Sequence, residues 1–362
     1  ININMSKEYT ALGLMSGTSG DGVDASIIRS DGKNKYEVIS NKYFEYDKKI
    51  NKSIHESIKI INCKKDLLSF NKIISLLEKD ITLFHAKVTK DFSNEDIDFL
   101  GFHGQTIYHN PNEKISKQLG DAKLLSQLTK KSVIHNFREN DIKNNGQGAP
   151  LAPIFHRLII NQKNLNKPVS ILNIGGIANI TSVSSDDRMF SSDIGPGNCL
   201  IDEWIRANSK KKYDDKGNIA QSGVINKIIL DQSLDNFYNN KVSQKKSYDI
   251  KDFDISFVRG LLLEDGAATL TEFTSEILSQ KIFDKNIYVC GGGRKNEFLL
   301  KSIQKKIKGK IELIDKLGID GDFVESQAFA YLAIRSFLKL PISFPETTGC
   351  LKECSGGEII KY

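Results

Sequence analysis

A glycine-rich segment near the start of the chain, Gly13 to Ile28 (GLMSGTSGDGVDASII), combines residues suited to binding a polyphosphate. Its central SGTSGDG offers backbone N–H groups that no large side chain obstructs, together with three hydroxyl side chains. Two acids of the segment, Asp21 and Asp24, would repel a phosphate unless a divalent cation lay between them, as Mg²⁺ commonly does in nucleotide sites. The alternative interpretation is a surface loop that binds nothing.

Two later segments extend the same pattern. Val169 to Val183 (VSILNIGGIANITSV) again places a Gly-Gly turn between two apolar strands. The run Gly291 to Gly293 opens a predicted helix whose first N–H groups could meet a nucleotide, although a packing turn explains these glycines equally. The sequence contains no GxxxxGK[ST], no GxGxxG opening a helix and no protein-kinase set. The remaining interpretation is that glycine hairpins from two halves of the chain bind the phosphates.

The segments that must position these residues alternate between strands and helices, which predicts an α/β fold. The two glycine hairpins indicate a duplicated plan, and a further strand is expected within Asp96 to His109. Apolar residues recur at helical spacing over Glu264 to Gln280 and Asp320 to Leu338. Loops are expected over residues 111–116, 138–150 and 210–223.

Composition narrows the class of protein. A chain of 362 residues exceeds the usual size of a single core, so two lobes with a cleft are expected. Hydrophobic residues make up 39% and no apolar run reaches the length of a membrane span, which predicts a soluble protein with no membrane partner. The net charge of +6 comes from scattered lysines without a nucleic-acid motif, so no nucleic-acid partner is expected.

The termini and cysteines indicate the compartment. The first residues lack a signal peptide, which predicts a cytoplasmic protein, and Met5 is a candidate for the true start. The five cysteines form no CxxC pair, and their odd number argues against a disulfide framework. We expect reduced thiols.

Taken together, the motifs resemble a known family. Two glycine hairpins, an isolated aspartate in DIGPGN and a late GGG are similar to the superfamily of sugar kinases, actin and heat-shock ATPases. The strings MSGTSGDGVDA, GFHGQT, GQGAPL, NIGGIANIT, DIGPGN, CGGGRKNEFL, VESQAFAYLA and SFPETTG, in this order within residues 13–349, resemble the anhydro-N-acetylmuramic acid kinase family.

The resemblance implies a two-lobed actin-like or sugar-kinase ATPase fold, with a duplicated mixed-sheet core and a central cleft. We expect an N-terminal lobe of residues 1–135 plus 343–362 that holds the first phosphate hairpin. Residues 136–342 would then form a C-terminal lobe with the second hairpin, the catalytic aspartate and the adenosine motif.

The resemblance also implies an activity. The enzyme would use ATP, Mg²⁺ and water to convert the amino sugar 1,6-anhydro-N-acetylmuramate into N-acetylmuramate 6-phosphate during peptidoglycan recycling. It would act as a homodimer in the cytoplasm.

Several site residues follow from the resemblance and from the residues themselves. Asp193 matches the family's catalytic aspartate, and Glu325 matches a glutamate in its cleft. Asp21 is expected to hold Mg²⁺, Gly175 and Gly176 to meet phosphates, and Asn296, after Gly291, Gly292 and Gly293, to approach the adenosine. The ATP-binding stretch of the family falls on Gly17, Thr18, Ser19, Gly20, Asp21, Gly22, Val23 and Asp24.

Other interpretations of these side chains stay open. Asp193 suits a general base for water, but a turn aspartate can also bond its own backbone. Glu325, three residues after Asp322, has the spacing of a helix capping box. His103 or Gln105 would position the substrate, or His103 is a structural histidine at the end of a strand.

Arg138 is the candidate partner of the sugar's lactyl carboxylate, because guanidinium matches carboxylate bidentately; a surface arginine is the alternative. Two positions depart from the family pattern. Gly20 replaces a larger apolar residue, which should only loosen the loop. Asn136 replaces an aspartate, which puts in doubt the contact that this aspartate makes, to substrate or to Arg138; restoring aspartate is expected to raise activity or leave it unchanged.

Two rival functions share these motifs. One is an actin-type scaffold that binds ATP without a small-molecule acceptor, for which GQGAPL and HGQT have no evident use. The other is a kinase of ordinary N-acetylated sugars on the same fold, which the fold by itself does not exclude.

Overall fold

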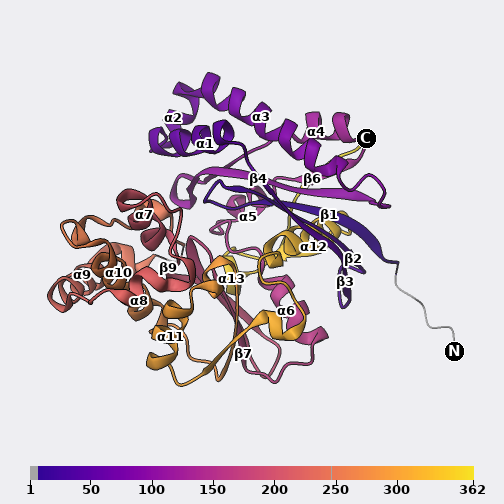
Figure 1. Ribbon diagram of the computed structural model, residues 1–362. Coiled ribbons are helices and arrows are strands. Elements are labelled where there is room, and N and C mark those ends of the chain that lie inside the picture. Colours follow the sequence, from indigo (N-terminus) through magenta and orange to yellow (C-terminus); the bar gives the residue numbers. More distant parts are fainter. Residues whose placement is uncertain (1–6, 246) are drawn as a thin grey trace. The chain divides into compact units, whose positions relative to one another are not determined.

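The computed structural model describes residues 7–245 and 247–362, so the predicted start at Met5 lies outside it. The chain divides into two compact units: unit 1 comprises the chain up to Asn164 together with Phe323–Tyr362, and unit 2 comprises Leu165–Asp322. Each unit contains a mixed β-sheet with packed helices (Figure 1). The predicted α/β class is therefore confirmed.

The sheet of unit 1 has the strand order β14-β6-β4-β1-β2-β3, with β5 added to β4. β1 and β2 are antiparallel, with Met15 opposite Asp24, which confirms the first predicted hairpin. β1 is parallel to β4, and β4 is parallel to β6. The strands are β1 (Tyr9–Ser16), β2 (Gly22–Ser30), β3 (Tyr36–Glu45), β4 (Phe99–Asn110), β5 (Ile115–Leu119), β6 (Ser132–His135) and β14 (Glu358–Ile360).

The sheet of unit 2 repeats this plan in the order β11-β10-β7-β8-β9. β7 is antiparallel to β8 and parallel to β10, which in turn is parallel to β11. The series β9-β8-β7-β10-β11 therefore matches β3-β2-β1-β4-β6 in order and direction, and the predicted duplication is confirmed. The strands are β7 (Val169–Ile174), β8 (Ile177–Val183), β9 (Met189–Pro196), β10 (Asn286–Cys290) and β11 (Lys310–Leu313).

Helices cover both faces of the sheet of unit 1, with α1 to α4 on one face and α12 on the other (Figure 1). Gly13 and Gly101, side by side on β1 and β4, let α12 approach closely. A Cβ atom on Gly13 would lie 2.0 Å from the Ser326 carbonyl oxygen, and one on Gly101 would lie 2.5 Å from that of Phe329. The helices are α1 (Lys48–Ile60), α2 (Lys64–Ser69), α3 (Asn71–Lys90), α4 (Ala122–Thr129), α5 (Glu139–Lys143), α6 (Pro153–Gln162), α12 (Val324–Phe337) and α13 (Pro345–Thr348).

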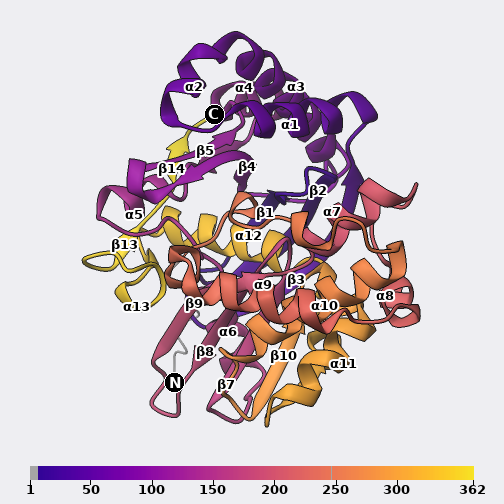
Figure 2. The ribbon, with the colours of Figure 1, turned by 90° about the vertical axis from the view of Figure 1, so that its left-hand side faces the viewer.

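In unit 2, the buried helix α10 packs against β9 and against the other helices of the unit (Figure 2). It spans Leu263–Ser279, close to the predicted range, and its apolar side chains join one core with those of α7. The remaining helices are α7 (Cys199–Asn208), α8 (Asn218–Ser222), α9 (Lys227–Asn239) and α11 (Glu297–Lys306). Among residues 7–245 and 247–362, no helix combines the length and apolar character needed to cross a bilayer.

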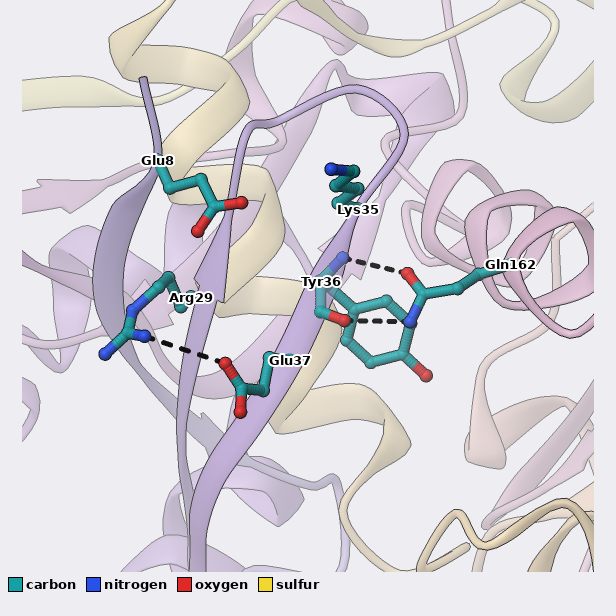
Figure 3. A pocket seen from close by; sticks show the side chains of 6 residues that line it. All are labelled: Glu8, Arg29, Lys35, Tyr36, Glu37 and Gln162. Carbon is teal, nitrogen blue, oxygen red and sulfur yellow. Dashed lines mark hydrogen bonds and ion pairs between the residues drawn. The ribbon is translucent and has the colours of Figure 1, made fainter. Parts of the chain in front are cut away.

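The boundaries of unit 1 differ from the predicted lobe boundaries at residues 135 and 343. The segment after β6 stays with unit 1 because α6 is bonded to the edge strand β3: the Gln162 side chain accepts from Tyr36 N (2.9 Å) and donates to Tyr36 O (2.8 Å). These residues line a pocket of about 200 Å³ (Figure 3). At the other boundary, α12 belongs to unit 1 because it packs on β1, β2 and β4.

Short elements interrupt the predicted loops. Residues 111–116 form a 3₁₀ turn and the start of β5, residues 138–150 contain α5, and residues 210–223 contain α8. The C-terminal segment adds a small two-stranded sheet of β12 (Pro341–Ser343) and β13 (Cys354–Ser355). Chain segments this short carry little periodicity, so the sequence pattern did not distinguish them from loops.

Candidate functional site

The tip of the first hairpin is a structured turn. Gly20 has φ +64°, and its N–H donates to the carbonyl of Gly17 (3.1 Å). The Asn51 side chain of α1 donates to the Gly20 carbonyl (2.9 Å). A Cβ atom on Gly20 would lie 2.8 Å from Ile54 Cγ2. Glycine at this position therefore permits close packing of the tip on α1, whereas the sequence predicts a looser loop.

The residues of the predicted ATP-binding stretch differ in their exposure to solvent. Thr18, Ser19 and Asp21 are exposed, and their side chains are available to a ligand. Gly22 and Val23 are buried, and Val23 is part of the core of unit 1. We expect these two residues to reach a phosphate with backbone atoms only.

Carboxylates gather beside the tip, around Tyr43 of β3. Asp24 pairs with Tyr43 across the strands, and Glu45 pairs with Gly22. Burial, followed by the charges of Asp21, Glu45 and Asp24, raises the pKa of Tyr43 to about 12. The exposed Asp21 carboxylate fits Mg²⁺, which is usually bound through one or two carboxylates and completed by water and phosphate oxygens.

Gln105 connects β4 to the tip. This fully buried side chain donates from Nε2 to the Gly17 carbonyl (2.9 Å) and to the Thr106 carbonyl (3.3 Å). Its Oε1 is buried without a hydrogen-bond partner in the described part of the chain. A buried acceptor without a donor costs about 1–3 kcal/mol, so Oε1 is a place where a ligand or water donor would be stabilised.

His103 and Arg138 are brought together. His103 Nε2 accepts from Arg138 Nη2 (2.9 Å), and His103 Nδ1 lies 2.8 Å from the Gly104 carbonyl. Burial, reinforced by the positive charge of Arg138, holds the pKa of His103 well below its usual range. The imidazole is therefore neutral, with its proton on Nδ1. Arg138 also donates from Nη1 to the Gly148 carbonyl (2.9 Å), so the guanidinium is held from two sides.

Glu325 lies in the first turn of α12, but the capping-box interpretation is wrong. The N-cap is Phe323, without a side-chain cap, which places Glu325 second in the helix. Asp322 instead pairs with Arg294 (2.5 Å) and Lys295 (2.6 Å). The carboxylate of Asp322 is stabilised more by two cations than by one backbone N–H, which explains why it does not cap the helix.

Asn136, where the family pattern has aspartate, is surrounded by acids. It has φ +59°, a conformation that asparagine tolerates. Its side-chain amide donates to Glu139 and to Glu358 Oε1 (3.3 Å). These contacts of Asn136 lead to two glutamates rather than to Arg138.

We expect Asn136→Asp to lower the melting temperature by about 2 °C at pH 7.5, equivalent to roughly 1 kcal/mol. The substitution removes a donor and adds a third carboxylate beside Glu139 and Glu358. Asn145→Asp is the matched control, because Asn145 is exposed and has φ +62°. Equal melting temperatures of the two variants by calorimetry at pH 7.5 would contradict this expectation.

The second glycine tip, in unit 2, is bonded to the segment after Asp193. Asn198 N donates to the Gly175 carbonyl (2.8 Å), and Gly197 N donates to the Gly176 carbonyl (2.9 Å). A Cβ atom on Gly197 would lie 2.1 Å from the Gly175 oxygen, so only glycine permits this approach. The structure therefore joins NIGGIANIT and DIGPGN, two motifs about twenty residues apart in the sequence, into one constellation.

The GGG run lies in the same constellation. A Cβ atom on Gly291 (φ +79°) would lie 2.3 Å from Asn173 Oδ1, and one on Gly293 would lie 3.0 Å from Asn198 Nδ2. Gly292 has open space around it. Gly292 begins a 3₁₀ turn, Gly292–Lys295, and α11 follows it. Gly291 and Gly293 are thus required for packing, and Gly292 is the glycine that leaves room for a ligand.

Asn296 is the N-cap of α11 and is 6% exposed. Its side-chain oxygen accepts from Leu299 N (3.0 Å). Capping uses this oxygen, so a contact with adenosine would involve the side-chain nitrogen.

Asp193 lies on β9 beside an irregularity in the β8–β9 ladder and is only 6% exposed. Its Oδ2 accepts from Tyr248 N (2.9 Å). Burial lowers the pKa of Lys281, and the negative charge of Asp193 offsets part of this shift. Lys281 Nζ lies 6.0 Å from the centre of the Tyr248 ring. A buried carboxylate held in one orientation can accept a proton from a bound molecule.

Most of the predicted residues thus fall into one group in each unit. In unit 1, Gln105 of β4 bonds to the first tip. His103, on the same strand, bonds to Arg138. Unit 2 joins the second tip with the GGG run, and Asp193 follows on β9. Sequence reasoning missed Tyr248 and Lys281 beside Asp193, because neither lies in a glycine motif and both reach Asp193 from distant parts of the chain.

Comparison with known proteins places the chain in a family. The family model described as anhydro-N-acetylmuramic acid kinase matches residues 9–362. An anhydro-N-acetylmuramic acid kinase of Pelagibacter ubique is 55% identical over 99% of this chain and 100% of its own length. One of Zymomonas mobilis is 36% identical over 96% and 99%, respectively.

A solved structure, the activator of a 2-hydroxyisocaproyl-CoA dehydratase from Clostridium difficile, has a TM-score of 0.43 and 11% identity, covering 90% of this chain and 94% of that chain. The match of a family model to nearly the whole chain, together with 55% identity to a curated relative, shows that this chain belongs to the anhydro-N-acetylmuramic acid kinase family.

Proposed function

We propose that this chain is an ATP-dependent kinase that opens 1,6-anhydro-N-acetylmuramate with water and phosphorylates its 6-oxygen, giving N-acetylmuramate 6-phosphate and ADP. Membership of the family over residues 9–362 carries the proposal. The buried Asp193 carboxylate and the two structured glycine tips support it, because they supply a proton acceptor and phosphate-binding backbone.

Asp193 acts as the general base. The oxygen of water bonds to the anomeric carbon while the bond from that carbon to the 6-oxygen breaks, and the water proton passes to the Asp193 carboxylate. The released 6-oxygen attacks the γ-phosphorus, and ADP leaves. The hydrogen bond from Tyr248 N to Oδ2 of Asp193 fixes the orientation of the carboxylate that accepts the proton.

Phosphoryl transfer needs chiefly positioning and charge neutralisation. The backbone of Gly17 to Gly22 binds phosphate oxygens, and the backbone of Gly175 and Gly176 also serves as a phosphate-binding element. Asp21 holds Mg²⁺, which neutralises phosphate charge when bound. Asn296 contacts the adenosine from the α11 N-terminus.

Arg138 binds the lactyl carboxylate of the sugar. The neutral His103 and the Gly148 carbonyl hold its guanidinium in one orientation, which limits the entropy lost on binding. Gln105 Oε1 accepts a hydrogen bond from a sugar hydroxyl or from a bound water. Glu325, half-buried in the first turn of α12, contacts the substrate. The protein acts in the cytoplasm as a homodimer.

An ATP-coupled assay across a panel of amino sugars tests the proposed function. We expect ADP release with 1,6-anhydro-N-acetylmuramate, little with 1,6-anhydro-N-acetylglucosamine, which lacks the lactyl group, and little with reducing N-acetylmuramate. Equal rates with ordinary N-acetylated sugars would favour a general amino-sugar kinase. ADP release that no sugar changes would favour a nucleotide-binding scaffold.

The origin of the new anomeric oxygen tests the mechanism. In ¹⁸O-water we expect label on the anomeric carbon and none in the phosphate. Because the anhydro bridge occupies the β face, water guided by Asp193 arrives from the opposite side, as in inverting glycosidases, and the α-anomer forms first. Prompt mass spectrometry and NMR measure both features before ring opening scrambles the label. Label in the phosphate, or initial β-anomer, would overturn the mechanism.

A further inference from the structure

A buried cluster of metal-ligating side chains lies in unit 1, outside the residues assigned to the reaction. The carboxylate of Asp141 on α5 and the thiols of Cys350 and Cys354 lie within 4.8 Å of one another. The three residues are 1%, 2% and 3% exposed. In the described part of the chain, both thiols donate to the same acceptor, the carbonyl of Lys352 (3.1 Å each).

The geometry points to a zinc site: we propose that Asp141, Cys350 and Cys354 bind one Zn²⁺ ion. The two cysteines are separated by three residues, within the two to four residues usual between zinc-binding cysteines. With Zn–S bonds of about 2.3 Å, tetrahedral ligands lie about 3.8 Å apart. The three ligand atoms thus need to move by only about 1 Å or less to coordinate one ion.

The hydroxyl oxygen of Ser343 offers a fourth ligand atom. Ser343 of β12 pairs with Cys354 of β13, and its hydroxyl is buried without a hydrogen-bond partner in the described part of the chain. Such a hydroxyl is stabilised by a metal ion or by a water that the ion holds. On binding, both thiols release their protons to solvent. The Lys352 carbonyl then loses its two S–H donors. Because Lys352 is exposed, water can replace them.

The ion would fasten the C-terminal segment to the loop that supports Arg138. Asp141 Oδ2 already accepts from Gly148 N (2.7 Å), and its Oδ1 accepts from Thr348 Oγ1 (2.6 Å). Gly148 in turn accepts from Arg138. The site is therefore structural, and it stabilises the segment that holds Arg138.

Titration of the untagged, chelator-treated full chain with Co²⁺ and Zn²⁺ tests this proposal. We expect one Co²⁺ per chain with thiolate charge-transfer absorption, displacement of Co²⁺ by Zn²⁺, and a higher melting temperature with Zn²⁺. Cys350→Ser and Cys354→Ser should each weaken Zn²⁺ binding at least about 100-fold. Cys63→Ser, at the N-cap of α2, is the matched control and should bind as the unaltered chain does.

Two outcomes would overturn the zinc site: no thiolate absorption in the unaltered chain, or equal binding by Cys350→Ser, Cys354→Ser and Cys63→Ser. Thiol labelling of the unaltered chain gives a measurement that needs no variant. Zn²⁺ should protect two of its five thiols from reaction, and protection of none would contradict the proposal.

Discussion

Asp193→Asn is expected to lower kcat by about 10²–10⁴-fold, because an amide cannot accept the proton of the attacking water. The asparagine oxygen can still accept from Tyr248 N, so the local backbone should keep its geometry. ATP binding, measured by calorimetry, should change little. The coupled ADP assay at saturating ATP and anhydro sugar measures the loss of turnover.

Asp231→Asn is a suitable control, since this aspartate is exposed on α9 of the same unit and should leave kcat unchanged. Circular dichroism and melting temperature show whether Asp193→Asn is folded. A folded variant that keeps more than about a tenth of the rate would show that Asp193 is not the base, because removal of a general base costs far more.

Gly197→Ala is expected to lower kcat/KM for ATP by about 100-fold. The added methyl would lie 2.1 Å from the Gly175 carbonyl oxygen. The clash must displace either the second glycine tip or the start of α7, and it breaks the bonds from Gly197 N and Asn198 N to the tip. A displacement of about 1 Å at a phosphate-binding loop is enough for a loss of this size.

Gly292→Ala separates this steric effect from the loss of a glycine. Gly292 lies in the same unit, and no atom lies within 4 Å of where its Cβ would be. The Gly292→Ala variant should therefore have a melting temperature much closer to that of the unaltered chain than Gly197→Ala has. If Gly197→Ala bound ATP and turned over like the unaltered chain, the bonds between the Gly-Gly turn and residues 197–199 would have no role in positioning the tip.

Much of the fold could be predicted from local pattern. Two glycine turns between apolar strands indicated two hairpins and a duplicated plan, and the sheets have matching strand orders. Helical spacing of apolar residues placed α10 within one residue at each end. Such elements are determined locally, because periodicity and turn chemistry act over a few residues. The motif strings, read together, also indicated the family.

The boundaries of the units and the partners of the site residues depend on contacts between distant segments. Gln162 bonds to Tyr36 across 126 residues, and His103 meets Arg138 across 35. Asp193 meets Tyr248 across 55 residues, and Asp141 lies beside Cys350 across more than 200. Such pairs leave no local pattern, because side-chain packing after folding decides which of many acids, amides and thiols meet. The sequence by itself therefore determined the elements and the kind of chemistry, while the tertiary structure decided that His103 is neutral, that Arg138 is held by two acceptors, and that the thiols of Cys350 and Cys354 converge on one carboxylate.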